Sequence, residues 1–136
     1  MAYQYPSEVF SLSFEVFGES FTSEFPVRVF FMDRDNCEYF VYADGKAKYP
    51  SPIAPEILEV NGIYPEKLEA KFQEENPAAD AWSLATSEFI SWFYACWLRA
   101  GGENFYLLAS IGGHDSAKEF NLKSGVWQER NAHFHP

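Results

Sequence analysis

The residues best suited to chemistry are His114 and Asp115, which form the one adjacent His–Asp pair in the chain. On a helix, with His and Asp ligands from neighbouring helices, such a pair suits a metal-dependent phosphohydrolase. Here it lies in ENFYLLASIGGHDSAKEF (103–120), between Gly112–Gly113 and Ser116, and these neighbours are typical of turns. We therefore expect a turn after a strand, with Asp115 bonded to local backbone and an exposed tip available to a binding partner.

The alternative is a small metal-dependent hydrolase centred on these two residues, and it requires further ligands. The remaining histidines, His133 and His135, lie two apart in the C-terminal NAHFHP and share a face if the chain is extended there. Tetrahedral zinc sites take four protein ligands, or three and a water. His114, Cys37 or an acid would have to converge on the tail, and no spacing in the sequence indicates this. We expect no metal and no cofactor.

Neither cysteine is placed as a nucleophile. Cys96 lies in the apolar run FISWFYACWL (89–98), where we expect a small core residue. Cys37 stands between Asp35 and Glu38, whose negative charges disfavour the reactive thiolate. The chain also has no Gly-x-Ser-x-Gly sequence, and SIGGHDS lacks the lysine of a phosphate-binding loop. These features favour a non-catalytic protein. Two free thiols suit a reducing cytosol, although the sequence leaves a disulfide between them open.

Charge and aromatic content point to a protein partner. The 136 residues include 20 Asp and Glu against 10 Lys and Arg, giving a formal net charge of −10, together with 14 Phe, 8 Tyr and 4 Trp. The negative field repels nucleic acid and anionic membranes and attracts basic surfaces. So many large rings exceed what one core hides, and we expect some of them at the surface.

Acidic and aromatic residues gather in DRDNCEYFVYADG (33–45), at the two ends of a predicted strand. Tyrosine is a strong contact anchor, and flanking acids steer a basic partner toward it. We predict the partner-binding residues in this segment and at the His–Asp pair: Asp33, Asp35, Glu38, Tyr39, Tyr42, Asp44, His114 and Asp115. The alternative interpretation of this segment is the ordinary outer face of a sheet.

Hydrophobic alternation predicts the strands that must position these residues. In VFSLSFEVF (9–17), Phe10, Leu12, Phe14 and Val16 face one way and Ser11, Ser13 and Glu15 the other, as in a half-buried strand. Further strands are expected at 26–32, 38–43, 104–112, 118–122 and 126–130. Asp44–Gly45 is a favoured tight-turn pair that leads into a short additional strand.

Helical spacing occurs in the middle of the chain. It predicts one turn at 55–60, a short helix at 65–75 and a long helix at 77–100 that ends at Gly101–Gly102. Strands, then helices, then strands indicate a single α+β domain over 1–136. We expect an antiparallel sheet of about five to seven strands, packed against a helical layer dominated by the long apolar helix. A pocket between that helix and the sheet would instead suit a small-ligand-binding module.

The helix FISWFYACWLRAGG, followed by FYLLASIGGHDS and FNLKSGVW, resembles the C-terminal halves of small acidic bacterial immunity proteins, which neutralise polymorphic toxins. The resemblance implies stoichiometric inhibition of a toxin by occlusion. It carries over no binding residues, because those surfaces vary among immunity proteins. The expected function is a non-catalytic inhibitor, of immunity or anti-defence type, that occludes a basic site on a toxin or on a host or phage factor.

Two further features concern location. The N-terminal MAYQYPSEVF lacks the basic start and long apolar run of a signal peptide. No stretch reaches the roughly 18 uncharged apolar residues that a membrane span needs. We expect a cytoplasmic protein that does not contact membranes.

Overall fold

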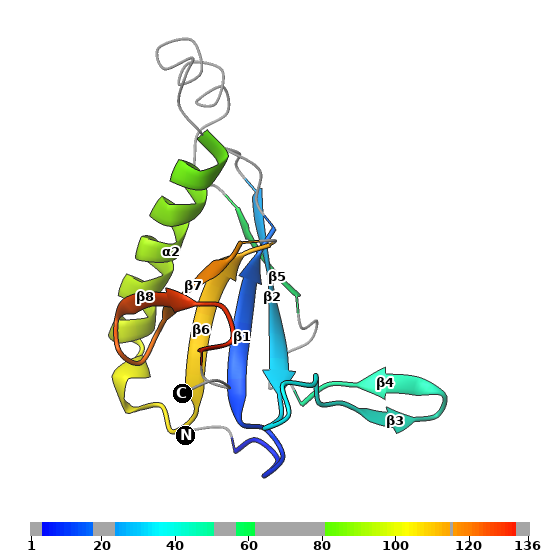
Figure 1. Cartoon of the computed structure of the whole chain (residues 1–136). Helices are drawn as coiled ribbons and strands as arrows, with labels where there is room; N and C mark the ends of the chain where they lie inside the picture. Colours follow the sequence, from blue (N-terminus) through cyan, green and yellow to red (C-terminus); the bar gives the residue numbers. More distant parts are fainter. Residues whose placement is uncertain (1–3, 18–23, 51–56, 62–80, 115, 133–136) are drawn as a thin grey trace.

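The computed structural model describes residues 4–17, 24–50, 57–61, 81–114 and 116–132. These residues form an α+β fold in which one helix, α2 (Ala81–Arg99), packs along one face of a mostly antiparallel sheet (Figure 1). The sheet has the order β5-β2-β1-β6-β7-β8, with β1 (Ser11–Val16), β2 (Glu24–Met32), β5 (Ile57–Asn61), β6 (Leu108–Gly113), β7 (Lys118–Asn121) and β8 (Val126–Glu129). A separate two-stranded sheet pairs β3 (Val41–Ala43) with β4 (Lys46–Lys48).

The alternation in β1 sorts its side chains as predicted. Leu12 and Val16 are buried, and the Phe14 ring lies 5.2 Å from that of Phe93 on α2, so this face packs against the helix. The opposite face carries Ser11, Ser13 and Glu15. The buried face continues onto the neighbouring strands, because Leu12 lies opposite Phe31 on β2 and Ala109 on β6, and both of these are buried. The buried hydrophobic side chains of the described residues are Val9, Leu12, Val16, Val27, Phe31, Ala85, Phe89, Ile90, Ala109, Ile111 and Leu122.

The centre of the sheet departs from the antiparallel expectation. β1 pairs in parallel with β6, from Ser11 opposite Leu108 to Val16 opposite Gly113, whereas the other neighbours are antiparallel. Alternating hydrophobicity sets which face a side chain takes, but it does not encode strand direction. The parallel pairing places the C-terminal ends of β1 and β6 side by side at one end of the sheet, where Glu15 and His114 are in contact.

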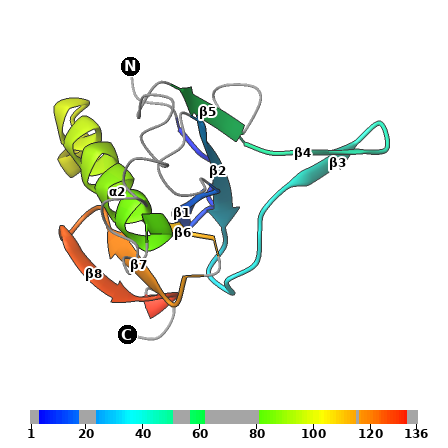
Figure 2. The same ribbon diagram turned by 90° about the horizontal axis from the view of Figure 1, so that it is seen from above.

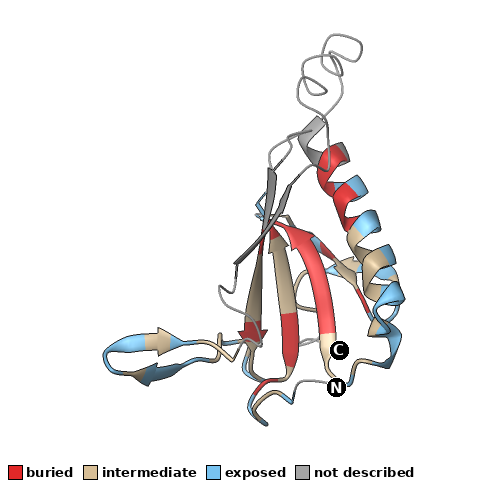
Figure 3. Ribbon diagram, turned by 180° about the vertical axis from the view of Figure 1, so that it is seen from behind, coloured by how far each residue is buried: buried red, intermediate tan, exposed pale blue. Residues whose placement is uncertain are grey.

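The helix is amphipathic only in part. Its predicted range of 77–100 is confirmed from Ala81 to Arg99, and residues 77–80 lie outside the described part of the chain. Ala85, Phe89 and Ile90 are buried against the sheet. Trp92 and Leu98 on the same helix are 43% and 37% exposed. As predicted, large rings reach the surface, and Figure 3 shows the exposed residues on this helix and on β3–β4.

Several predicted boundaries are corrected by tertiary pairing. The helical turn expected at 55–60 is wrong for Ile57–Asn61, which forms β5 and pairs antiparallel with β2. The strand expected at 104–112 begins only at Leu108, because Gly102–Asn104 forms a 3₁₀ turn, η1, after the helix. The helix expected at 65–75 lies outside the described residues. Among the residues that are described, no helix is long and apolar enough to cross a bilayer.

Candidate functional site

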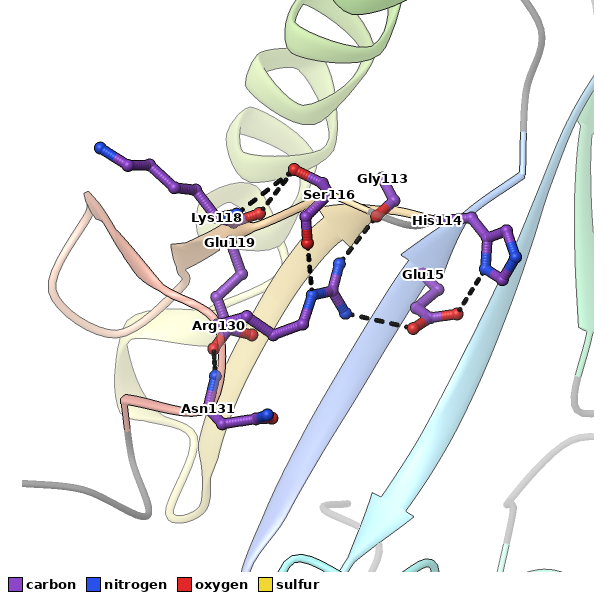
Figure 4. A network of polar contacts seen from close by, with 8 residues as sticks. All are labelled: Glu15, Gly113, His114, Ser116, Lys118, Glu119, Arg130 and Asn131. Carbon is purple, nitrogen blue, oxygen red and sulfur yellow. Dashed lines mark hydrogen bonds and ion pairs between the residues drawn. The ribbon is translucent and has the colours of Figure 1, made fainter.

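His114 follows β6 directly and faces the end of β1 (Figure 4). Its backbone N–H donates to the carbonyl of Val16 at 2.9 Å, which extends the parallel pairing by one residue. Its imidazole Nδ1 lies 3.4 Å from Oε2 of Glu15, and its ring packs on Phe17 at a centroid distance of 4.6 Å. The side chain is 51% exposed. The predicted strand end is confirmed, whereas Asp115 lies outside the described residues.

Arg130 organises the polar contacts around this strand end. Its Nη1 lies 3.1 Å from Oε1 of Glu15, so Glu15 is placed between Arg130 and His114 (Figure 4). Nη2 donates to the carbonyl of Gly113 at 2.7 Å, and Nε donates to the carbonyl of Ser116 at 2.6 Å. The guanidinium thus fastens the end of β8 to the loop between β6 and β7. Sequence reasoning missed this role of Arg130, because VWQER predicts a strand but does not show which residues the arginine contacts.

A buried carboxylate continues the network. Glu119 is only 4% exposed, and its Oε1 accepts from the backbone N–H of Asn131 at 2.7 Å and from Nε2 of Gln128 at 3.4 Å. A buried acid needs such donors, because burial of an unpaired charge is costly. Glu119 therefore holds the chain after β8 against the sheet, as Arg130 does.

The arrangement supplies no aligned nucleophile and base among the described side chains. The Ser116 hydroxyl donates to the carbonyl of Lys118 at 3.0 Å. A pocket of about 310 Å³ nearby is lined by residues that do not include His114: Thr86, Ser87, Ile90, Gly113, Ser116, Lys118 and Trp127. In the same described ranges, no group of three or more His, Cys, Asp or Glu residues could hold a metal ion. His133 and His135 lie outside those ranges.

His114 therefore has a modest expected effect on stability. Its contact with Glu15 is long and solvent-exposed, so the His114→Ala variant should lose no more than about 1 kcal/mol of unfolding free energy. Urea denaturation followed by circular dichroism measures this, with Ser124→Ala as a control on an exposed turn. A loss of unfolding free energy above about 2 kcal/mol would contradict this expectation and show that His114 contributes to stability as a structural residue.

The predicted hairpin is the second candidate site. Asp44 and Gly45 have φ of 54° and 74°, the two positive values that a type I′ turn requires, and β3 and β4 flank them. The strand expected at 38–43 is confirmed only from Val41 to Ala43, because Glu38 makes just an isolated bridge to Met32. Figures 1 and 2 show the hairpin projecting from the main sheet. Val41 and Tyr42 are 51% and 71% exposed, and the Phe40 ring lies 5.2 Å from that of Tyr42. Strand β3 of the hairpin and the residue before it therefore carry accessible apolar side chains.

The acids near the hairpin base are engaged within the chain to different degrees. Asp33 Oδ1 accepts from the N–H groups of Asp35 and Cys37 at 2.9 and 3.0 Å, which closes a turn. Glu38 lies 3.6 Å from Arg28. Asp35 is exposed at this turn, while Tyr39 packs against the core and donates its N–H to the carbonyl of Phe31.

The predicted partner-binding residues fall at two separate places. The hairpin follows the C-terminal end of β2, where Met32 forms a bridge with Glu38. Met32 lies opposite Ser11 at the start of β1, whereas His114 follows Gly113, which lies opposite Val16 at the end of β1. Figure 1 shows that the β2 and β6 arrows end at opposite ends of the sheet. The six residues of β1 separate the two ends, roughly 20 Å at the usual rise per residue. The hairpin group and His114 therefore do not form one continuous surface.

Comparison with known proteins gives no relative. No family model, no curated protein and no solved structure matches the chain. Its function is therefore inferred from its own residues and geometry.

Proposed function

We propose that the protein is a non-catalytic binding protein that engages another protein through the β3–β4 hairpin. The observation that carries the proposal is the projecting hairpin with Phe40, Val41 and Tyr42 exposed at 37%, 51% and 71%. A two-stranded hairpin is marginally stable by itself. Apolar side chains that gather on an exposed surface are typical of interaction sites. Tyrosine is also among the residues that dominate binding energy at protein interfaces.

Electrostatics supports a basic partner. The net charge of −10 attracts a basic surface over long range and raises the rate of encounter. Asp35 and Asp44 are exposed at the base and the tip of the hairpin, while Lys46 and Lys48 on β4 make the tip itself mixed in charge. In the finer form of the proposal, acids steer the partner, the rings anchor it, and the bound protein occludes a basic site as an inhibitor of the immunity or anti-defence type.

Site-specific photo-crosslinking tests the proposal. A benzophenone amino acid is placed at Tyr42 or, as a matched exposed aromatic control, at Trp92, and each variant is expressed in the native host. We expect a discrete crosslinked product from position 42 that contains a second, basic protein and is absent from position 92. No product at either position, the same products at both, or a product made only of two copies of this chain would contradict it.

The captured protein allows a quantitative prediction. Tyr42→Ala should weaken binding at least about 30-fold, because truncation of an anchoring ring costs about 2 kcal/mol or more. The unfolding midpoint should not change, since the side chain is mostly exposed. Titration calorimetry with the purified partner measures the affinity, and Trp92→Ala serves as the control. Equal affinities of the two variants would place the interface elsewhere.

A further inference from the structure

A second site lies at the C-terminal end of α2, away from the polar network. A pocket of about 410 Å³ is lined by β1, the end of α2, the turn that follows it and the N-terminal segment. Five rings form most of its wall: Tyr5, Phe14, Trp97, Phe105 and Tyr106. The volume lies within the range of small-molecule sites, which are mostly apolar with a few polar groups.

The walls of this aromatic pocket are held in place by contacts between the lining residues and by one ring outside the pocket. Trp97 and Phe105 pack edge to face at 5.4 Å, and Phe14 is supported by Phe93 from α2. The Tyr5 backbone N–H donates to the hydroxyl of Tyr106 at 2.9 Å, which joins two segments 101 residues apart. Because the rings fix one another, a ligand would meet aromatic walls that are already in place and would lose little free energy in ordering them.

Trp97 contributes an unused donor. Its indole Nε1 is the one buried side-chain nitrogen or oxygen of the described residues that has no hydrogen-bond partner. Such a buried donor costs about 1–3 kcal/mol and calls for an explanation. Gly102 covers it so closely that a Cβ on that residue would lie 2.2 Å from Nε1. Gly101, at φ 85°, forms the turn before it.

The lining also defines the charge of the ligand. No charged side chain of the described residues lines the pocket; besides the rings, Leu12 and Ala100 are apolar and Asn104 is a neutral amide. A charged ligand group would be desolvated there without a counter-ion. We propose that this pocket binds a small uncharged aromatic molecule, and that Gly102 moves off the indole on binding so that a carbonyl or hydroxyl oxygen of the ligand accepts a hydrogen bond from Trp97 Nε1. The site is independent of the hairpin, and the proposal stands whether or not the hairpin binds a protein.

The test uses 2-acetylnaphthalene as a neutral aromatic ketone and 2-naphthoate as its charged counterpart. Both are titrated into the ¹⁵N-labelled full chain, and the indole N–H signals are followed by NMR, with that of Trp97 assigned from Trp97→Phe. We expect saturable binding of the ketone, a downfield shift largest at Trp97, and at least tenfold weaker binding of the carboxylate. Absence of binding at the ketone's solubility limit, equal affinities, or saturation without the Trp97 shift would overturn the proposal.

Two matched helix variants locate the binding site. Ala100 and Ala95 are both exposed on or next to α2, but only Ala100 lines the pocket. Ala100→Phe should fill the pocket and weaken ketone binding at least tenfold, whereas Ala95→Phe should leave it unchanged. Equal loss in both variants, or in neither, would contradict the site. If Ala100→Phe fails to fold, chemical-shift mapping of ketone binding on the unmodified chain locates the site instead. The largest shifts must then lie at Phe14, Trp97 and Phe105.

Discussion

Replacement of Arg130 by alanine is expected to lower the free energy of unfolding by about 3 kcal/mol, within the range for breaking a largely buried ion pair. The guanidinium donates to the carbonyls of Gly113 and Ser116 and pairs with Glu15, and both charged side chains are mostly buried, at 25% and 19% exposure. Its loss leaves the Ser116 carbonyl without this donor and Glu15 without its closest cation, whereas the Gly113 carbonyl keeps the Ser116 N–H as a donor. Unfilled partners of this kind cost more than the net value of the bonds themselves.

Arg130→Lys and Arg99→Ala are the controls for this prediction. Lysine keeps the charge but not the forked geometry, so Arg130→Lys should fall between the native chain and Arg130→Ala. Arg99 is exposed in the last turn of α2, and its replacement should change stability by no more than about 0.5 kcal/mol. Urea denaturation measures all three. A loss below about 1 kcal/mol in Arg130→Ala would show that the network does not hold β8 to the sheet.

The second large effect is expected at Gly102. A Cβ there would lie 2.2 Å from Nε1 and 2.3 Å from Cδ1 of Trp97, so the ring or the turn must move. Gly102→Ala should therefore lower stability by about 2–3 kcal/mol, as overpacking does. The neighbouring Gly101 has φ 85° and nothing within 4 Å of its Cβ position. Gly101→Ala should cost only the backbone strain of about 1–2 kcal/mol.

Thermal and urea unfolding of these two variants separates steric overlap from backbone strain. Adding Trp97→Phe should recover part of the loss in Gly102→Ala, because the smaller ring leaves room for the methyl group, and should recover none in Gly101→Ala. If Gly102→Ala is no less stable than Gly101→Ala, the close approach of the glycine to the indole is not present in solution.

Local pattern predicted a good part of the fold. Alternation in β1 identified its buried face, because successive strand residues point to opposite sides whatever lies beside the strand. Asp44–Gly45 identified the hairpin, because both residues tolerate the positive φ that its turn requires. The helix over Ala81–Arg99 followed from apolar spacing. Each of these signals is contained within one element.

The features that the sequence pattern did not predict all depend on which elements lie next to each other in the fold. Ile57–Asn61 became a strand because β2 offered an edge to pair with, although its proline-rich surroundings indicated a loop or helical turn. Glu15 and Arg130 are 115 residues apart, and nothing in either local sequence points to the other. The same holds for Tyr5 and Tyr106 at the aromatic pocket.

The sequence by itself determined the α+β class, the buried faces, the hairpin turn and the excess of acid and aromatic side chains. Tertiary structure alone decided the parallel pairing of β1 with β6, the use of Glu15 as a partner of both His114 and Arg130, the separation of His114 from the hairpin, and the pocket around Trp97. The physical reason is that backbone preference and side-chain period act over a few residues. Strand neighbours and cavities are set by how the apolar faces of distant elements pack together.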